Sequence, residues 1–354
     1  GILGGNMTHI PTPRSATRGV SYDFVNSIRF ISIALIVLGH SSSVVGHEFM
    51  GSNMVASTLF YSLQKFDIIC MYLVSGFLMG DAANRSKEYV MRRVNRTFSP
   101  WLIWAGVMTV ITILSFIVNA TPLAELPAAI YHLITRTSYW FIPNYIFSLM
   151  FMFFVLRYVP RKLSGALLLI ATLLYGANLY GEWFTTQHTT AWFGFMIYLW
   201  VGAYARQNWT TLEPMIRRID WKWFLASSVL LGVLVALETR FLMTFSDDAA
   251  NALKFSNHLY SLSCALLLIT FPWRIIPKWI DSRRESFGVY LTHSLILVLM
   301  YQVTKRLGFT AQGKPEWVAM IMWVLAGSVA YLLSIALVKV LVRMGKGSWV
   351  GDTV

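Results

Sequence analysis

Residues 27–40 read SIRFISIALIVLGH, an apolar run that contains one arginine and ends on one histidine. The run lies within a longer apolar stretch, residues 25–45, and about 20 such residues cross the hydrocarbon core of a bilayer as a helix. Arg29 and His40 are eleven residues apart. At about 100° and 1.5 Å per residue, they share one helix face and lie about 16 Å apart along the axis. The segment therefore predicts a membrane-spanning helix with a cation near one end and a titratable imidazole deep inside.

Nine more stretches of similar length and hydropathy follow along the chain. Hydrophobic residues make up 56% of the 354 residues and charged residues only 13%, whereas a soluble domain carries about 25% charged residues. Lipid must therefore be the solvent for most of the chain. We predict an all-α polytopic membrane protein with about ten transmembrane helices. The predicted spans are residues 25–45, 57–80, 98–119, 139–158, 163–181, 190–206, 222–242, 256–273, 286–304 and 318–342.

The distribution of lysine and arginine predicts the orientation of these spans. With the N-terminus inside, 21 of the 29 basic residues fall in inner segments and 6 in outer segments. Basic residues concentrate on the cytoplasmic side of membrane proteins, so both chain ends are predicted to be cytoplasmic. The net charge of +13 is then explained by topology, and no nucleic-acid partner is expected.

The same segmentation predicts one membrane domain with short flanking segments. Residues 1–6 are interpreted as a cloning remnant before Met7, residues 7–24 as a cytoplasmic N-terminal segment, residues 25–342 as the ten-helix domain, and residues 343–354 as a cytoplasmic tail. The two cysteines, Cys70 and Cys264, lie in apolar runs. They predict neither a disulfide framework nor a metal site.

Polar residues within the predicted spans are functional candidates, because burying them in the membrane is costly. The second span carries Lys65 and Asp67, which either pair with each other or line a polar cavity, and then Ser75-Gly76, a small pair that allows close helix approach. The ninth span carries Tyr290 and His293, three residues apart on one face.

Charged and titratable residues outside the membrane core give further candidates. Arg92, Arg93 and Arg96 follow the second span at helical spacing, and they either bind phosphate groups or only fix the topology. Glu238 near Arg240 suits an ion pair. The histidines of outer segments are candidates for contact with an external substrate, although solvated loop positions are the simpler interpretation. They are His132, His188 and His258.

Taken together in this order, the motifs resemble the acyltransferase-3 family of bacterial membrane O-acyltransferases. The first feature is the Arg-x10-His pattern of Arg29 and His40. The others are Ser75-Gly76-Phe77, the basic inner loop with Arg93 and Arg96 before Pro100, Tyr139-Trp140-Phe141, and Tyr290-Leu291-Thr292-His293. The resemblance covers nearly the whole chain.

The resemblance implies transfer of an acyl group, acetyl by default, from cytoplasmic acyl-CoA to a hydroxyl of a surface glycan or lipid-linked oligosaccharide. Arg29 with Arg92, Arg93 and Arg96 would bind the donor phosphates, and His293 would lie beside the donor. His40 would act as general base, or less plausibly as a covalent acyl carrier. Candidate oxyanion stabilisers are Tyr290, Ser75 and Lys65. Candidate substrate-binding residues are Lys65, Asp67, Glu238 and Trp140.

The implied location is the bacterial cytoplasmic (inner) membrane, with lipid contacts, a possible homo-oligomer and no metal.

Two alternative functions belong to other classes of protein. A glycan or small-molecule transporter would use the same buried polar groups along a permeation path, but no repeated motifs relate the two halves of the chain. A membrane scaffold for polysaccharide assembly would keep its function when His40 is replaced by alanine.

Overall fold

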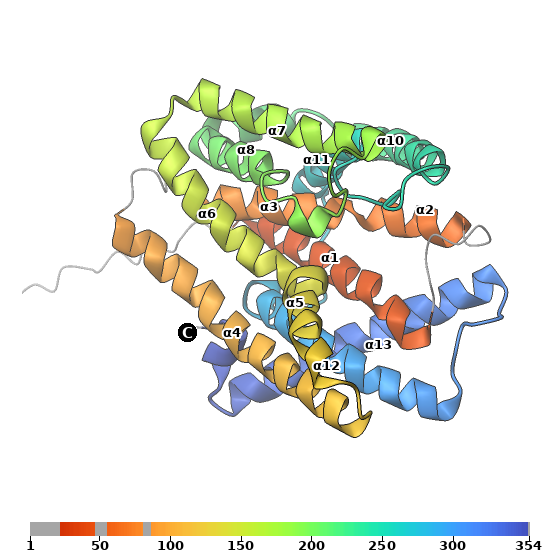
Figure 1. Ribbon diagram of the computed structural model, residues 1–354. Helices are drawn as coiled ribbons and strands as arrows, with labels where there is room; N and C mark the ends of the chain where they lie inside the picture. The colour runs from red at the N-terminus through yellow and green to blue at the C-terminus, as the bar shows by residue number, and fades with distance from the viewer. Residues whose placement is uncertain (1–21, 47–54, 81–85, 353–354) are drawn as a thin grey trace, which may run out of the picture.

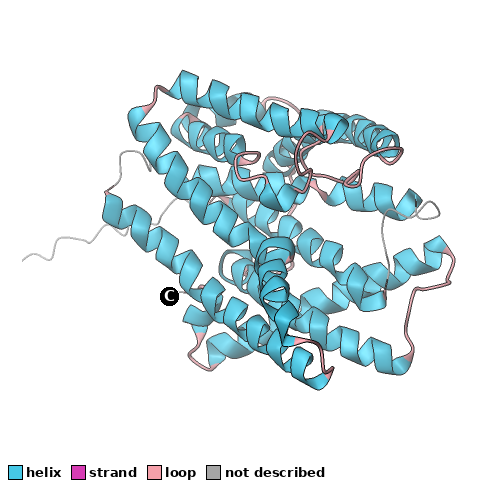
Figure 2. Cartoon of the chain, in the orientation of Figure 1, coloured by secondary structure: helices cyan, strands magenta, loops and turns pink. Residues whose placement is uncertain are grey.

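The computed structural model describes residues 22–46, 55–80 and 86–352, and these residues form helices and connecting loops without any strand (Figure 2). The predicted all-α membrane fold is therefore confirmed. The helices are α1 (Asp23–His40), α2 (Val55–Gln64), α3 (Phe66–Met79), α4 (Lys87–Val118), α5 (Leu126–Arg136), α6 (Phe141–Tyr158), α7 (Arg161–Gly181), α8 (Met196–Gln207), α9 (Trp209–Arg217), α10 (Trp221–Leu242), α11 (Phe255–Thr270), α12 (Ser282–Leu307) and α13 (Glu316–Arg343).

Eight helical stretches of the described residues are long and apolar enough to cross a membrane. They correspond to eight of the ten predicted spans. The predicted sixth and eighth spans contain the shorter helices α8, of 12 residues, and α11, of 16 residues. A 12-residue helix is only about 18 Å long, less than the hydrocarbon core of about 30 Å. The irregular backbone before α8 is satisfied within the protein, because the Gly194 N–H donates to the Ala191 carbonyl at 3.0 Å and the Thr172 hydroxyl donates to the Gly194 carbonyl at 2.9 Å.

Helix α1 lies at the centre of the molecule and packs against α3, α11, α12 and α13 (Figure 1). Its contact with α13 is close, because the indole N–H of Trp323 donates to the Leu38 carbonyl at 2.6 Å. Both ends of the described chain lie beside the start of α12. There the Ser282 hydroxyl donates to the Asn26 carbonyl at 2.9 Å, and Arg284 pairs with Asp352 at 2.7 Å. The two ends therefore lie at the same end of the helices, as an even number of crossings requires.

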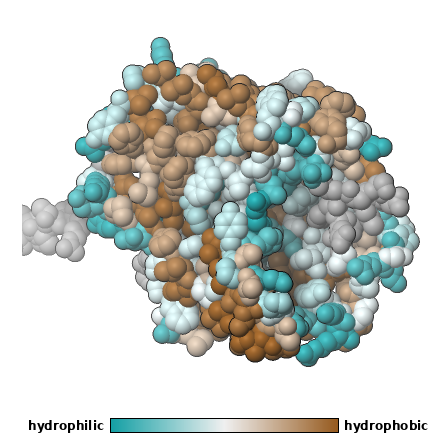
Figure 3. Space-filling model, in the orientation of Figure 1, coloured by the Kyte–Doolittle hydropathy of each residue, from teal (hydrophilic) through white to brown (hydrophobic). Residues whose placement is uncertain are grey.

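The surface is consistent with a lipid environment. Figure 3 shows hydrophobic residues gathered over α6 and α7 and along the lower edge of the face in view, with a strip of hydrophilic residues between them. Many large apolar side chains of α4, α7, α10 and α13 are exposed, among them Ile117, Leu167 and Leu230. In water such an exposed apolar surface would promote aggregation, so these faces are expected to contact lipid.

The second predicted span is broken into α2 and α3 at Lys65. Neither proline nor glycine occurs at the break. The side chain of Asn257 donates to the Lys65 carbonyl at 3.4 Å, and a side chain inserted into the helical hydrogen-bond ladder is one cause of such breaks. The break brings the end of α2 and the start of α3 to the polar interior described below.

Glycines allow α3 and α8 to pack with their backbones in contact. A Cβ atom at Gly76 would lie 2.2 Å from the Leu199 carbonyl oxygen, and one at Gly202 would lie 2.1 Å from the Leu73 carbonyl oxygen. Only hydrogen fits at these two positions. The small residues of the second span therefore act as predicted, allowing close helix approach.

We expect Gly76→Ala to lower the free energy of unfolding by about 1–3 kcal/mol, because helix backbone cannot move aside for the added methyl group. The measurement is the apparent Tm in detergent. The matched control is Gly106→Ala in α4, where nothing lies within 4 Å of the added atom. Replacing that helical glycine should instead stabilise the protein, by about 0.5–1 kcal/mol. Equal Tm values for the two variants would contradict the packing argument.

Candidate functional site

The first part of the site is a basic pocket of about 670 Å³ at the start of α1, α4 and α12. Its arginines come from three helices, and none of the described residues that line it is a carboxylate. They are Arg29, Arg92, Arg93, Arg96 and Arg283. The four arginines singled out in the sequence thus come together, and Arg283, which the charge pattern had assigned only to topology, joins them. None of these five cations forms an ion pair with a carboxylate of the described residues, and such a cluster favours a ligand with several negative charges.

Arg93 is held in place by the end of α3. Its guanidinium donates to the Leu78 carbonyl at 3.0 Å and to the Ser75 carbonyl at 3.3 Å. Leu78 belongs to the last turn of α3, whose backbone oxygens lack helical partners, and Ser75 lies just before that turn. A planar guanidinium bound to these two carbonyls is fixed in orientation, so one edge of the basic pocket is rigid.

A narrower cavity of about 200 Å³, here called the neck, continues from the basic pocket. The two share Arg29, Arg93 and Arg283 among their lining residues. One face of α1 lines the neck with Arg29, Ile33 and Ile36, at the helical spacing that the sequence predicts. Ser75 also lies here, so it is a neck residue.

The next cavity, of about 240 Å³, contains His40 and is here called the chamber. It shares Ile36, Phe141 and Tyr290 with the neck. Polar side chains from four separate segments line it. They are His40, Tyr61, Gln64, Lys65, Asp67, Arg136, Ser138, His188 and Thr189. Trp140 also contributes to the wall, so the structure brings together six residues singled out in the sequence: His40, Lys65, Asp67, Trp140, His188 and Tyr290.

A fourth cavity of about 540 Å³, here called the outer pocket, adjoins the chamber. The two share Arg136, His188 and Thr189. Each cavity thus shares lining residues with the next, from the basic pocket through the neck and the chamber to the outer pocket. The resulting row connects an arginine cluster at one end of the helices to a polar pocket on the loops at the other.

His293 lies behind His40. The two rings are 5.5 Å apart between centroids, and His293 is fully buried and lines none of the four cavities. Its Nδ1 lies 2.5 Å from the Tyr290 carbonyl, which can only accept, so Nδ1 carries the hydrogen and Nε2 is left as an acceptor without a partner. His293 is therefore placed to orient His40, not to touch a ligand in the neck.

Tyr290 and its neighbours fix the turn that precedes α6. The Tyr290 hydroxyl donates to the Ser138 carbonyl, and the Tyr139 hydroxyl donates to the Leu291 carbonyl at 3.2 Å. The Ser138 and Ser294 hydroxyls are 2.5 Å apart. The turn that carries Trp140 is therefore bound to α12, and the Tyr290 hydroxyl hydrogen is already engaged.

Lys65 and Asp67 line the chamber but bind different partners. The Lys65 ammonium donates to the Tyr61 hydroxyl at 2.6 Å, and the Asp67 carboxylate accepts from the Ile68 N–H at 2.5 Å. The sequence left open whether Lys65 and Asp67 pair with each other or line a polar cavity, and the structure shows that they line a cavity. An ammonium carries three hydrogens, so Lys65 keeps two for a ligand or water.

Glu238 lies apart from the row of cavities. Its carboxylate accepts the backbone N–H groups of Phe255 and Ser256 at 2.9 and 2.7 Å and the Tyr180 hydroxyl. A carboxylate at a helix N-terminus satisfies free N–H groups and interacts well with the helix dipole. Its contacts are thus with the first turn of α11 rather than with Arg240, and they give it a structural role.

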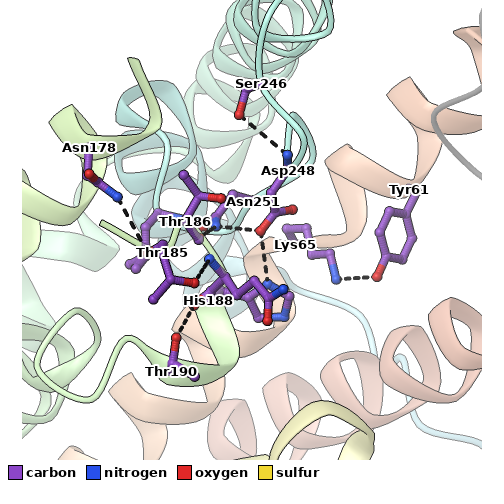
Figure 4. A network of polar contacts seen from close by, with 12 residues as sticks. Tyr61, Lys65, Asn178, Thr185, Thr186, His188, Thr190, Ser246, Asp248 and Asn251 are labelled. Carbon is purple, nitrogen blue, oxygen red and sulfur yellow. Dashed lines mark hydrogen bonds and ion pairs between the residues drawn. The ribbon is translucent and has the colours of Figure 1, made fainter. Parts of the chain in front are cut away.

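Sequence reasoning found His132 and His188, which both line the outer pocket, but it missed Arg136 and Asp248 beside them. Figure 4 shows Asp248 between His188 and Asn251: the His188 Nδ1 lies 3.6 Å from the carboxylate, and Asn251 donates to it at 2.7 Å. Burial alone would raise the pKa of Asp248, but the neighbouring His188 and Asn251 outweigh it and hold the pKa below its usual range. His188 precedes α8 and Asp248 follows α10, so no local sequence pattern signals that they meet.

Lys254 is a fully buried cation just before α11, and its ammonium donates to the Ser62 hydroxyl. Burial lowers the pKa of Lys254 to about 7, whereas an ordinary lysine has a pKa of about 10.4. Between these values the unfolded chain binds more protons than the folded one, so folding stability rises with pH.

We therefore expect the stability of the wild type to rise relative to Lys254→Met between about pH 7 and pH 9, by up to about 1.4 kcal/mol per pH unit. The measurement is the apparent Tm of both proteins across this range. Lys305→Met, which removes an exposed lysine of α12, should keep the wild-type slope. Parallel pH curves for the wild type and Lys254→Met would contradict the role of Lys254.

The fold and the row of cavities define a polytopic membrane protein that can hold a polyanionic ligand at one end and present it to a buried histidine. A family model described as an acyltransferase domain, acyltransferase-3, matches residues 22–339. The chain belongs to this family and is a membrane acyltransferase. Neither the curated proteins nor the solved structures include a match to it.

Proposed function

We propose that the protein transfers an acyl group, acetyl by default, from cytoplasmic acyl-CoA to a hydroxyl of a surface glycan presented from the other side of the membrane. The supporting observation is the row of four cavities that leads from five arginines to His40 and on to the outer pocket. One face of α1 carries both Arg29 and His40 along this row. The two ends of the row can therefore receive two substrates from opposite sides.

The basic pocket suits the donor. The nucleotide part of acyl-CoA carries several phosphate charges, and guanidinium groups bind phosphate by paired hydrogen bonds. The neck between the basic pocket and the chamber suits the narrow pantetheine arm. An extended arm of this kind is on the order of the 16 Å that separates residues 29 and 40 on a helix. The thioester would then lie in the chamber.

In the proposed reaction, His40 takes the proton of the acceptor hydroxyl while the oxygen attacks the thioester carbonyl carbon. The carbon–sulfur bond of the resulting tetrahedral intermediate breaks, and the proton on His40 passes to the departing sulfur. The products are an ester and free CoA. His293 packs against the His40 ring, with the two ring centroids 5.5 Å apart, and lines none of the cavities, so we assign it as a positioning residue.

Among the three candidate oxyanion stabilisers, the geometry favours Lys65. Ser75 lies in the neck, away from the cavity that contains His40. The Tyr290 hydroxyl already donates to the Ser138 carbonyl. Lys65 lies in the chamber and keeps hydrogens free beyond its bond to Tyr61.

The experiment is release of free CoA from acetyl-CoA by the purified protein in nanodiscs, with a crude lipid-linked glycan extract as acceptor. Free CoA should form, and acetyl ester should be found on the glycan, only when protein, donor and acceptor are all present. Absence of both binding and turnover, with acetyl-CoA and with longer acyl-CoAs, would show that the donor assignment is wrong. Glycan flux across vesicles would then be measured for the transporter alternative.

A further inference from the structure

Arg136 is a cation between the chamber and the outer pocket, and none of the described residues is its partner. It is the last residue of α5, and it lines both cavities. Its Nη1 atom is buried and makes no hydrogen bond, and no carboxylate of the described residues pairs with it. A buried donor left unsatisfied costs free energy, more so on a charged group, so its retention calls for an explanation.

The position at a helix C-terminus does not supply that explanation. A cation in the last turn interacts favourably with the helix dipole, but the effect needs only proximity and leaves the side chain free to turn to water. The Nη1 atom of Arg136 is turned away from water and donates to no backbone carbonyl. It is directed to the protein interior, where two cavities meet.

Two further polar side chains of the same wall lack partners. Gln64, at the end of α2, is only 4% exposed, and neither its amide oxygen nor its amide nitrogen makes a hydrogen bond. The Thr189 hydroxyl is buried and unpartnered as well. Both residues line the chamber, and Thr189 also lines the outer pocket. An amide and a hydroxyl both donate and accept, which suits the hydroxyl groups of a sugar.

The carboxylates of these cavities do not neutralise Arg136. Asp248 in the outer pocket is engaged by His188 and Asn251 (Figure 4). Asp67 in the chamber accepts the Ile68 N–H. An arginine with unused donors, in a partly desolvated place with no acid bound to it, is suited to an oxyanion.

We propose that the junction of the chamber and the outer pocket binds an anionic acceptor glycan, with Arg136 on a carboxylate or phosphate oxyanion and Gln64 and Thr189 on sugar hydroxyls. The proposal rests on the acyl transfer proposed above, since it names the class of acceptor for the same site. A saccharide held in this way has its free hydroxyls in the cavity that contains His40. The oxyanion can belong to a uronic acid or to a sugar phosphate.

Three probes of similar size distinguish recognition of the anionic group from recognition of the sugar hydroxyls. They also distinguish a carboxylate from a phosphate. They are methyl β-D-glucuronide, glucose 1-phosphate and the neutral methyl β-D-glucoside. Their binding to the full-length protein in nanodiscs is measured by saturation-transfer difference NMR, in the absence of acetyl-CoA. We expect at least one anionic probe to bind roughly ten- to a hundredfold more tightly than the neutral glucoside. The better anionic probe identifies the source of the charge.

Variants test which residue recognises the charge of the anionic probe. Arg136→Gln should reduce the affinity for the anionic probe to that for the neutral glucoside, whereas Arg136→Lys should keep part of the preference. Gln64→Leu should weaken the anionic and neutral probes alike, because it removes hydroxyl contacts and not charge recognition. The matched control is Arg240→Gln, an exposed arginine of α10 that lines none of these cavities, which should bind like the wild type.

The proposal is overturned if the wild type binds the neutral glucoside as tightly as both anions, or if Arg136→Gln keeps the anion preference. Failure of the proposed function is distinguishable from either result. In that case acetyl-CoA is neither bound nor turned over, while the anion preference and its loss in Arg136→Gln are still observed.

Discussion

Replacing His40 with alanine is expected to lower the rate of acyl transfer by about 10²–10⁴-fold, the usual contribution of a general base. His40 lines the chamber beside Lys65 and Tyr290, as does the more outward His188, and none of the described residues makes a hydrogen bond to the His40 ring. It is therefore free to take a proton from an acceptor hydroxyl. The measurement is the initial rate of CoA release with saturating acetyl-CoA and acceptor, beside the apparent Tm.

Two variants separate loss of chemistry from loss of structure. Ser328→Ala replaces an exposed residue of α13 that lines none of the four cavities and should keep both rate and Tm. His293→Gln removes the ring behind His40 and should lower kcat with little change in the KM for acetyl-CoA, because His293 lines none of the cavities. Undiminished transfer by folded His40→Ala would contradict the general-base role and would favour the scaffold or transporter alternatives.

The fold could be predicted where apolar length alone decides it. Eight stretches are long enough to cross a bilayer, and their hydropathy already shows this. The count of ten spans stays a prediction, because the other two stretches contain the shorter helices α8 and α11, and hydropathy does not register a turn. Residues 191–195, before α8, are as apolar as a helix but form a turn, which is possible because the Gly194 N–H and carbonyl both bond within the protein. The break at Lys65 depends on Asn257, far away in the chain.

The candidate site, like the fold, could be predicted only where the residues belong to a single helix. Arg29 and His40 could be placed on one face because a single helix carries both. Arg92, Arg93 and Arg96 could be grouped for the same reason. The wall opposite His40 is built from the end of α2, the end of α5 and the loop before α8. Gln64, Arg136 and His188 meet only through tertiary packing, and no local pattern predicts such a meeting.

Replacing Arg29 with alanine is expected to reduce kcat/KM for acetyl-CoA by about 10- to 100-fold, mainly through KM. The guanidinium lines both the basic pocket and the neck, so it faces the point where the phosphate-bearing part of the donor would meet the pantetheine arm. A hydrogen bond to a charged group contributes about 1.5–3 kcal/mol, which corresponds to this range. The measurement is steady-state kinetics over a range of donor concentrations.

A truncated donor shows whether the arginines act on phosphate. Acetyl-pantetheine keeps the thioester and the arm but lacks the nucleotide phosphates, so Arg29→Ala and Arg93→Ala should use it about as well as the wild type does. The control Lys87→Ala, an exposed cation at the start of α4 that does not line the basic pocket, should keep wild-type kinetics with both donors. An equal loss with acetyl-CoA and with acetyl-pantetheine would place Arg29 at the reacting centre instead, because the phosphates would then contribute nothing to its effect.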